Sequence, residues 1–146
     1  MQQVTQAGTH ARQTARHGRL FRWGALIVSA HLVVVLWHAA LLVKLQPGFP
    51  GLAIGLLLLV NLLPIAGAFA FSMGANRLAG CAVVIPLATG LVIGGYSHFL
   101  SAGTDNVFRM SAGPLTLSFQ VSAVLLAVLE ALGCWIGLRM FFMRSV

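Results

Sequence analysis

The sequence predicts an all-α, polytopic membrane protein with four transmembrane helices in an up-down bundle and with its N and C termini cytoplasmic. The first observation behind this prediction is the composition, because 59% of the residues are hydrophobic and only 8% are charged. Soluble domains lie far from these values. The second is a series of four apolar runs, each long enough to cross about 30 Å of hydrocarbon at about 1.5 Å per residue. The third is the distribution of positive charge along the chain.

The four apolar runs form one predicted transmembrane domain, residues 20–146. The spans cover residues 20–43, 51–73, 78–100 and 115–143. Short segments with Gly, Pro or polar residues separate them, as expected for connections between helices. The longest connection is an outer loop, residues 101–114, in which the Asp105-Asn106 and Gly113-Pro114 pairs are typical of turns. No soluble domain is expected, because the spans and their connections use the whole of this region.

The positions of the nine Lys and Arg residues predict the orientation. Short cytoplasmic segments of membrane proteins collect these residues. Only Lys44 and Arg109 fall on the predicted outer side. Seven fall on the other side: Arg12, Arg16, Arg19, Arg22, Arg77, Arg139 and Arg144. We therefore expect a multi-pass protein of a bacterial-type inner membrane. The net charge of +7 is explained by the Lys and Arg residues that determine this orientation. A nucleic-acid partner is not expected, because the chain lacks a soluble surface on which basic and aromatic residues alternate.

Residues 1–19 form a basic polar segment that we expect to be a cytoplasmic tail. The first span follows it uncleaved, because its apolar run is too long for a signal peptide and no A-x-A site follows. The favoured interpretation is a solvated, partly disordered tail that contacts anionic lipid. The alternative is a helix that docks a partner, because Arg12, Arg16 and Arg19 would share one helical face.

Three pairs of glycines at GxxxG spacing predict close helix packing. Small residues at this spacing let a neighbouring helix approach closely in lipid. The contacts that they predict lie inside the bundle, between copies in a homo-oligomer, or with another subunit of a larger membrane complex. The pairs are Gly51 and Gly55, Gly90 and Gly94, and Gly133 and Gly137.

One polar cluster is predicted near the middle of the membrane. Counted inward from the outer ends of their spans, His31, Asn61 and Glu130 reach a similar depth. Glu130 is the only acid within any predicted span. A carboxyl group at that depth is costly unless it is protonated or has a partner, and such residues usually face the bundle interior. Three roles remain open for this cluster: interhelical hydrogen bonding, proton transfer and ligand binding.

A second polar group is predicted at the outer rim, where His38, His98 and Asp105 reach a similar level. His38 lies seven residues after His31, which places both on one face of the first span. Two histidines and a carboxylate are a suitable donor set for copper, zinc or non-haem iron, and two histidines on facing helices can hold a haem. The alternative is that each ring lies at the interface and bonds a lipid headgroup or a backbone carbonyl.

Three classes of function follow from these residues. The first is a membrane subunit that binds a metal or haem near its outer face, within a larger redox or metal-handling complex. The second is a proton-coupled transporter or channel that uses Glu130, and the third is a non-catalytic accessory subunit. We do not expect an enzyme acting on its own. The sequence contains no recognisable Ser-His-acid arrangement and no phosphate-binding loop. Cys81 and Cys134 form no CxxC pair.

Overall fold

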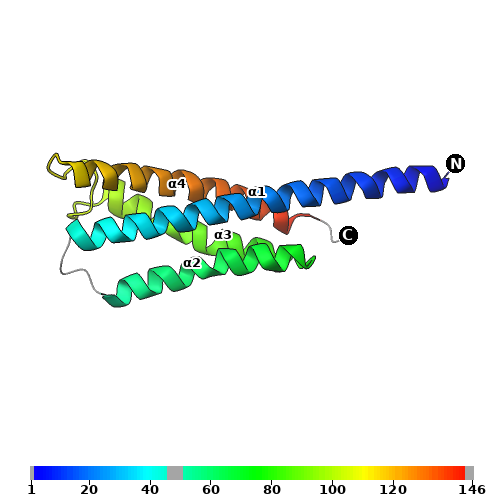
Figure 1. The fold of residues 1–146 in the computed structure, drawn as a ribbon, viewed down its shortest axis with the longest axis horizontal. Helices are drawn as coiled ribbons and strands as arrows, with labels where there is room; N and C mark the ends of the chain where they lie inside the picture. Colours follow the sequence, from blue (N-terminus) through cyan, green and yellow to red (C-terminus); the bar gives the residue numbers. More distant parts are fainter. Residues whose placement is uncertain (1, 46–50, 144–146) are drawn as a thin grey trace.

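The computed structural model describes the backbone of residues 2–45 and 51–143, and their side chains except those of residues 2–13, 51–54 and 56–60. The prediction of an all-helical protein is confirmed for this part of the chain. The elements are α1 (Gln2–Leu45), α2 (Gly51–Ser72), α3 (Asn76–Gly95), the π-helical turn η1 (Tyr96–Leu100) and α4 (Pro114–Phe141). Figure 1 shows the four α-helices packed with their axes roughly along the long axis of the molecule.

Within the described residues, three helices are long and apolar enough to cross a membrane. They comprise Thr14–Leu45, Asn76–Leu100 and Pro114–Phe141. The part of α2 from Asn61 to Ser72 is a shorter apolar helix. These lengths and compositions indicate a multi-pass membrane protein, because a span needs about 20 apolar residues.

The first helix differs from the prediction at its beginning. Residues 2–45 form one continuous helix, so the segment expected to be a partly disordered tail is helical from Gln2 onward. Figure 1 shows this N-terminal part of α1 extending beyond the other helices. The segment contains no proline and is rich in Gln, Ala and Arg, which favour helix, and it continues directly from a packed span.

The helices pack around α3 and α4. The most extensive contact is between α3 and α4, while α1 packs mainly on α4 and α2 mainly on α3. The contacts between α1 and α4 pair Gly24 with Met140 and His38 with Ser122. Since the residue number rises along one helix as it falls along the other, α1 and α4 run in opposite directions.

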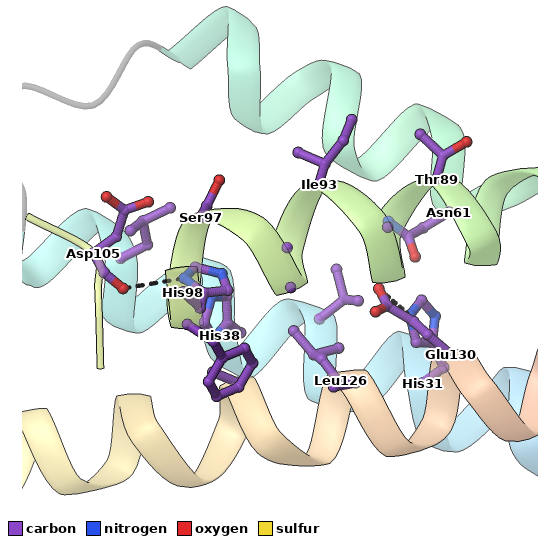
Figure 2. Close-up of a pocket in the computed structure, with 18 of the residues that line it drawn as sticks. His31, His38, Asn61, Thr89, Ile93, Ser97, His98, Asp105, Leu126 and Glu130 are labelled. Carbon is purple, nitrogen blue, oxygen red and sulfur yellow. Dashed lines mark hydrogen bonds and ion pairs between the residues drawn. The ribbon is translucent and has the colours of Figure 1, made fainter. Parts of the chain in front are cut away.

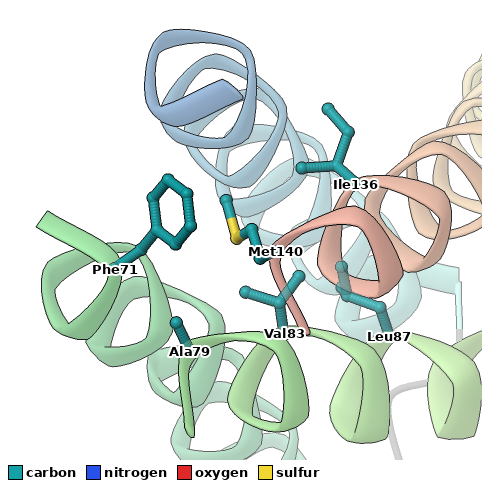
Figure 3. Packing of buried hydrophobic residues seen from close by; sticks show 6 residues of the cluster. All are labelled: Phe71, Ala79, Val83, Leu87, Ile136 and Met140. Carbon is teal, nitrogen blue, oxygen red and sulfur yellow. The ribbon is translucent and has the colours of Figure 1, made fainter. Parts of the chain in front are cut away.

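One end of the bundle has a tightly packed apolar core. Figure 3 shows this cluster, which joins α2, α3 and α4 and consists of Phe71, Ala79, Val83, Leu87, Ile136 and Met140. Glycines permit the close approach of α3 and α4 here. A Cβ added to Gly137 would lie 2.7 Å from Val84 Cγ2, and one added to Gly80 would lie 2.7 Å from the backbone nitrogen of Phe141. The contact between α3 and α4 at this end therefore contains little free space.

The opposite end is closed by the loop after η1. Leu41, Leu42, Val107, Phe119 and Ala123 form a second apolar cluster there. The loop folds back over this cluster: the Val107 N–H donates to the His98 carbonyl at 2.9 Å. The Gln120 amide donates to the Val107 carbonyl at 2.6 Å. The outer loop is thus hydrogen-bonded to both helices that it connects.

The last turn before this loop is a π-helix. The Ser101 N–H donates to the Tyr96 carbonyl five residues earlier, at 2.8 Å. Turns of this kind are rare within α-helices and recur at functional sites. His98 lies inside the turn, and its ring packs against that of His38 on α1. The π-helix therefore sets the orientation of one of the predicted rim residues.

Candidate functional site

A pocket of about 370 Å³ lies between the two apolar clusters. Side chains of α1, α3 and α4 form its walls, and Asn61 of α2 also lines it. Figure 2 shows that His31, Asn61 and Glu130 gather at one end and that His38, His98 and Asp105 gather at the other. The structure thus brings each of the two predicted polar groups together, and both groups line the same pocket.

One end of the pocket, which we call the inner end, contains the buried pair of His31 and Glu130. His31 Nε2 lies 3.5 Å from Glu130 Oε1, and the two side chains are 4% and 11% exposed. Gly90 of α3 provides the space for this carboxylate, because a Cβ at that position would overlap Glu130 Oε1. A carboxylate with so little solvent needs a compensating partner, and His31 supplies one from the neighbouring helix.

The spacing of residues on α1 and α4 explains how this pair forms. His31, Val35 and His38 belong to the buried face of α1, because they recur every three or four residues. On α4, Ser122 and Glu130 lie eight residues apart on the buried face. Because α1 and α4 are antiparallel and the two spacings are similar, His38 lies opposite Ser122 and His31 lies opposite Glu130.

At the outer end, the hydrogen bonds of His38 determine its tautomer. His38 Nδ1 lies 2.8 Å from Ser122 Oγ, and that hydroxyl donates its hydrogen to the Phe119 carbonyl, also at 2.8 Å. A hydroxyl has one hydrogen to give, so the Nδ1–H of His38 is the donor to Ser122. A neutral His38 then carries its lone pair on Nε2. This atom is buried and has no hydrogen-bond partner among the described residues.

His98 has the same tautomer for a similar reason. Its Nδ1 lies 3.2 Å from the backbone carbonyl of Asp105, which can only accept a hydrogen bond. A neutral His98 therefore also carries its lone pair on Nε2. The two rings lie with their centroids 4.9 Å apart and at 70° to each other, and the ring of Phe119 stacks on that of His38. The outer end of the pocket thus presents imidazole acceptors.

The predicted metal or haem site at His38, His98 and Asp105 is not supported by this arrangement. Asp105 reaches His98 through its backbone carbonyl rather than through its carboxylate. Within the part of the chain that the structure describes, no group of three or more His, Cys, Asp or Glu residues could hold a metal ion. The edge-to-face contact of the two rings also leaves no room for a haem plane between them.

The middle of the pocket is apolar. Val35, Ala123, Leu126 and Ala127 line it between the two polar ends. His31 and His38 are two helical turns apart, which corresponds to about 10 Å along the axis. The pocket therefore resembles typical small-molecule sites, which are mostly apolar, contain a few well-placed polar groups and measure about 300–1,000 Å³.

The predicted glycine contacts lie partly inside the bundle. A Cβ at Gly133 would overlap Leu87 Cδ1 of α3, and Gly137 faces Val83 and Val84. Gly55 has open space around it, and Gly94 meets only His98 of the next turn at 3.8 Å. The side-chain position of Gly51 lies outside the described residues. Gly133 and Gly137 thus serve the contact between α3 and α4.

Sequence reasoning missed two residues that complete the site, Ser122 and Phe119, and predicted for Gly90 only a helix-packing role. Ser122 could have been found from its spacing, because it lies eight residues before Glu130 and so on nearly the same face of α4. Phe119 and Gly90 had no comparable signal, since their roles depend on which helix lies opposite.

Comparisons with known proteins do not identify the chain. Neither the protein-family models nor the curated proteins nor the solved structures contain a match to it.

Proposed function

We propose that this chain is a ligand-binding membrane subunit of a bacterial-type inner membrane. Its four helices cross the membrane in alternating directions, with both termini in the cytoplasm. The excess of Lys and Arg at the N terminus, before α3 and at the C terminus supports this orientation. The ligand is a small lipid-soluble molecule held in the pocket between α1, α3 and α4.

The chemistry of the pocket ends suggests the class of ligand. A hydroxyl or N–H group on an otherwise apolar molecule would donate to Nε2 of His38. A second polar group, up to about 10 Å away, would meet the Glu130 and His31 end. An apolar body between them would pack on Leu126 and Ala127. Molecules of the hydroquinone type, with a ring hydroxyl and an apolar chain, have the required donor and solubility.

The observation that carries this proposal is the buried Nε2 atom of His38. His38 is only 4% exposed, and this acceptor has no hydrogen-bond partner among the described residues although the ring lines the pocket. A buried acceptor without a partner costs about 1–3 kcal/mol. A ligand that donates to it would recover that free energy, which favours binding at this position.

The test compares two phenylalanine substitutions on α4. Ala127 lines the pocket, whereas Ala131 lies one turn later and is exposed. The protein is purified in mild detergent, bound organic molecules are extracted and identified by mass spectrometry, and binding of added decylhydroquinone is titrated. We expect Ala127→Phe to lose both the extracted molecule and the added ligand, while Ala131→Phe retains them.

Two outcomes would reject the ligand-binding proposal. One is equal retention of the molecule by Ala127→Phe and Ala131→Phe, which would place the binding elsewhere. The other is the absence of any bound molecule together with no binding of decylhydroquinone to the wild-type protein. Elemental analysis of the same samples tests the metal prediction directly, because near-stoichiometric copper, iron or zinc would restore it.

A proton-coupled carrier is the second candidate, and the buried His31–Glu130 pair favours it. Both groups can exchange a proton, and both line the pocket through which a small substrate would pass. In liposomes, Glu130→Gln would abolish proton-linked flux while leaving the protein folded. Flux that is unchanged in this variant would exclude a carrier mechanism based on Glu130.

A further inference from the structure

A groove on the outside of the bundle has a different chemistry from the pocket. It runs between the first half of α1 and the last turns of α4, with a volume of about 800 Å³. On α1, Arg16, Arg19 and Trp23 line it at the spacing of one helical face. On α4, Trp135 and Arg139 line the opposite side.

The groove changes from basic to aromatic to aliphatic along its length. Arg16, Arg19 and Arg139 lie toward the N-terminal end of α1 and the C-terminal end of α4. Trp23 and Trp135 follow, and both are about half exposed, at 54% and 55%. Ile27 and Leu132 form the aliphatic end of the groove, next to His31 and Glu130 along their helices. This is the order in which a phospholipid presents its phosphate, its glycerol region and its acyl chains.

The charges of the groove are unbalanced. The chain has two acids, Asp105 in the outer loop and Glu130 paired with His31, and neither lines the groove. The Arg139 guanidinium lies over the Trp135 ring, 5.0 Å from its centroid. That contact holds the positive charge of Arg139 beside the groove without neutralising it.

We infer that this groove binds an anionic phospholipid, with the phosphodiester at Arg16, Arg19 and Arg139 and an acyl chain along Ile27 and Leu132. Guanidinium groups bind phosphate oxygens through paired N–H donors. Basic pockets between transmembrane helices bind anionic headgroups in this way, and tryptophan is enriched at the level of the headgroups. The charge of the groove selects phosphatidylglycerol over phosphatidylcholine, since only the former has a net negative headgroup.

The two tryptophans of the groove give a direct readout. The chain has three tryptophans, and Trp37→Phe leaves only Trp23 and Trp135, both in the groove. The full-length Trp37→Phe protein is placed in phosphatidylcholine vesicles that contain a small fraction of either dibrominated phosphatidylglycerol or dibrominated phosphatidylcholine. Bromine quenches tryptophan on contact. We expect the apparent affinity for the brominated phosphatidylglycerol to be about tenfold higher or more.

A matched pair of double substitutions separates a specific site from general surface charge. Arg16→Gln/Arg139→Gln removes two charges from the groove, whereas Arg22→Gln/Arg77→Gln removes two exposed charges that do not line it. We expect the preference for phosphatidylglycerol over phosphatidylcholine to fall about tenfold in the first variant and to be unchanged in the second. The amount of phosphatidylglycerol that remains bound after purification in detergent is measured by mass spectrometry. It should be lower for the first variant than for the second.

Three results would overturn the inference. The first is equal quenching by the two brominated lipids. The second is an equal loss of preference in the two double variants, which would indicate only a diffuse surface charge. The third is displacement of the brominated phosphatidylglycerol by inorganic phosphate but not by chloride at the same ionic strength, which would identify a phosphate site rather than a lipid site.

Discussion

Gly90 of α3 lies directly against the carboxylate of Glu130 on α4, so that a Cβ at position 90 would overlap Oε1. The absence of a side chain at Gly90 therefore decides where the only acid of the spans can lie. The same oxygen, Oε1, lies 3.5 Å from His31 Nε2. The acid thus contacts a glycine and a histidine from two different helices.

Gly90→Ala should disturb this arrangement. The added methyl group would displace the carboxylate from His31, and overpacking of this kind costs about 1–3 kcal/mol. Thermal unfolding in detergent measures the loss. Gly95→Ala on the same helix is the control, because a Cβ there meets nothing within 4 Å. It should be neutral or slightly stabilising, by up to about 1 kcal/mol. Equal effects of the two substitutions would contradict the role assigned to Gly90.

His31 and Glu130 should be energetically coupled. Removing one partner leaves the other polar group buried without compensation, which costs about 1–3 kcal/mol. We expect His31→Leu and Glu130→Gln each to destabilise the protein, and the double variant to be less destabilised than the sum of the two. The free energies of unfolding of the four proteins give the coupling. Strict additivity would show that the two side chains do not stabilise each other.

Ser122→Ala should weaken ligand binding more than folding. The substitution removes the acceptor of the His38 Nδ1–H, so the ring is no longer held in the tautomer that leaves Nε2 as an acceptor. We expect the dissociation constant for decylhydroquinone to rise about tenfold, which corresponds to about 1.4 kcal/mol.

Ser118→Ala is the matched control for this substitution. Ser118 lies one turn earlier on α4, and its hydroxyl donates to the Pro114 carbonyl at 3.0 Å. It makes no contact with His38 in the structure, so binding should be unchanged. A similar loss of affinity in both variants would mean that the effect comes from α4 as a whole.

Gly133→Leu should lower the free energy of unfolding of the isolated chain. A side chain at this position overlaps Leu87 of α3, so the helix pair with the most extensive contact must separate. We expect a loss of about 1–3 kcal/mol or more in detergent, without any partner present. Unchanged stability together with loss of a co-purifying protein would instead favour the accessory function predicted from the GxxxG spacing.

The sequence was sufficient to predict the helical class and which polar side chains lie at the same level along the bundle. Counting residues from the span ends placed His31, Asn61 and Glu130 at one level, and all three line the inner end of the pocket. The same counting placed His38 and His98 together at the outer end. Helical rise is regular, so depth is predictable from residue number.

The details of hydrogen bonding were not predictable in this way. Asp105 was expected to contribute a carboxylate, but the path of the outer loop directs its backbone carbonyl at His98 instead. Loop geometry depends on local backbone angles that composition does not determine. The rotation of each helix about its own axis was also unknown, so the roles of Gly90 and Phe119 could be found only from the structure.

The π-helical turn that carries His98 makes the outer end of the pocket sensitive to chain length. Deleting the residue before His98, Ser97, would convert the wide turn into ordinary α-helix and move His98 by one position, or about 100°, around the helix axis. The ring of His98 would then leave His38, although no residue type at the site had changed. Among related chains, an insertion or deletion at this point would therefore distinguish proteins that keep the two-histidine rim from those that have lost it.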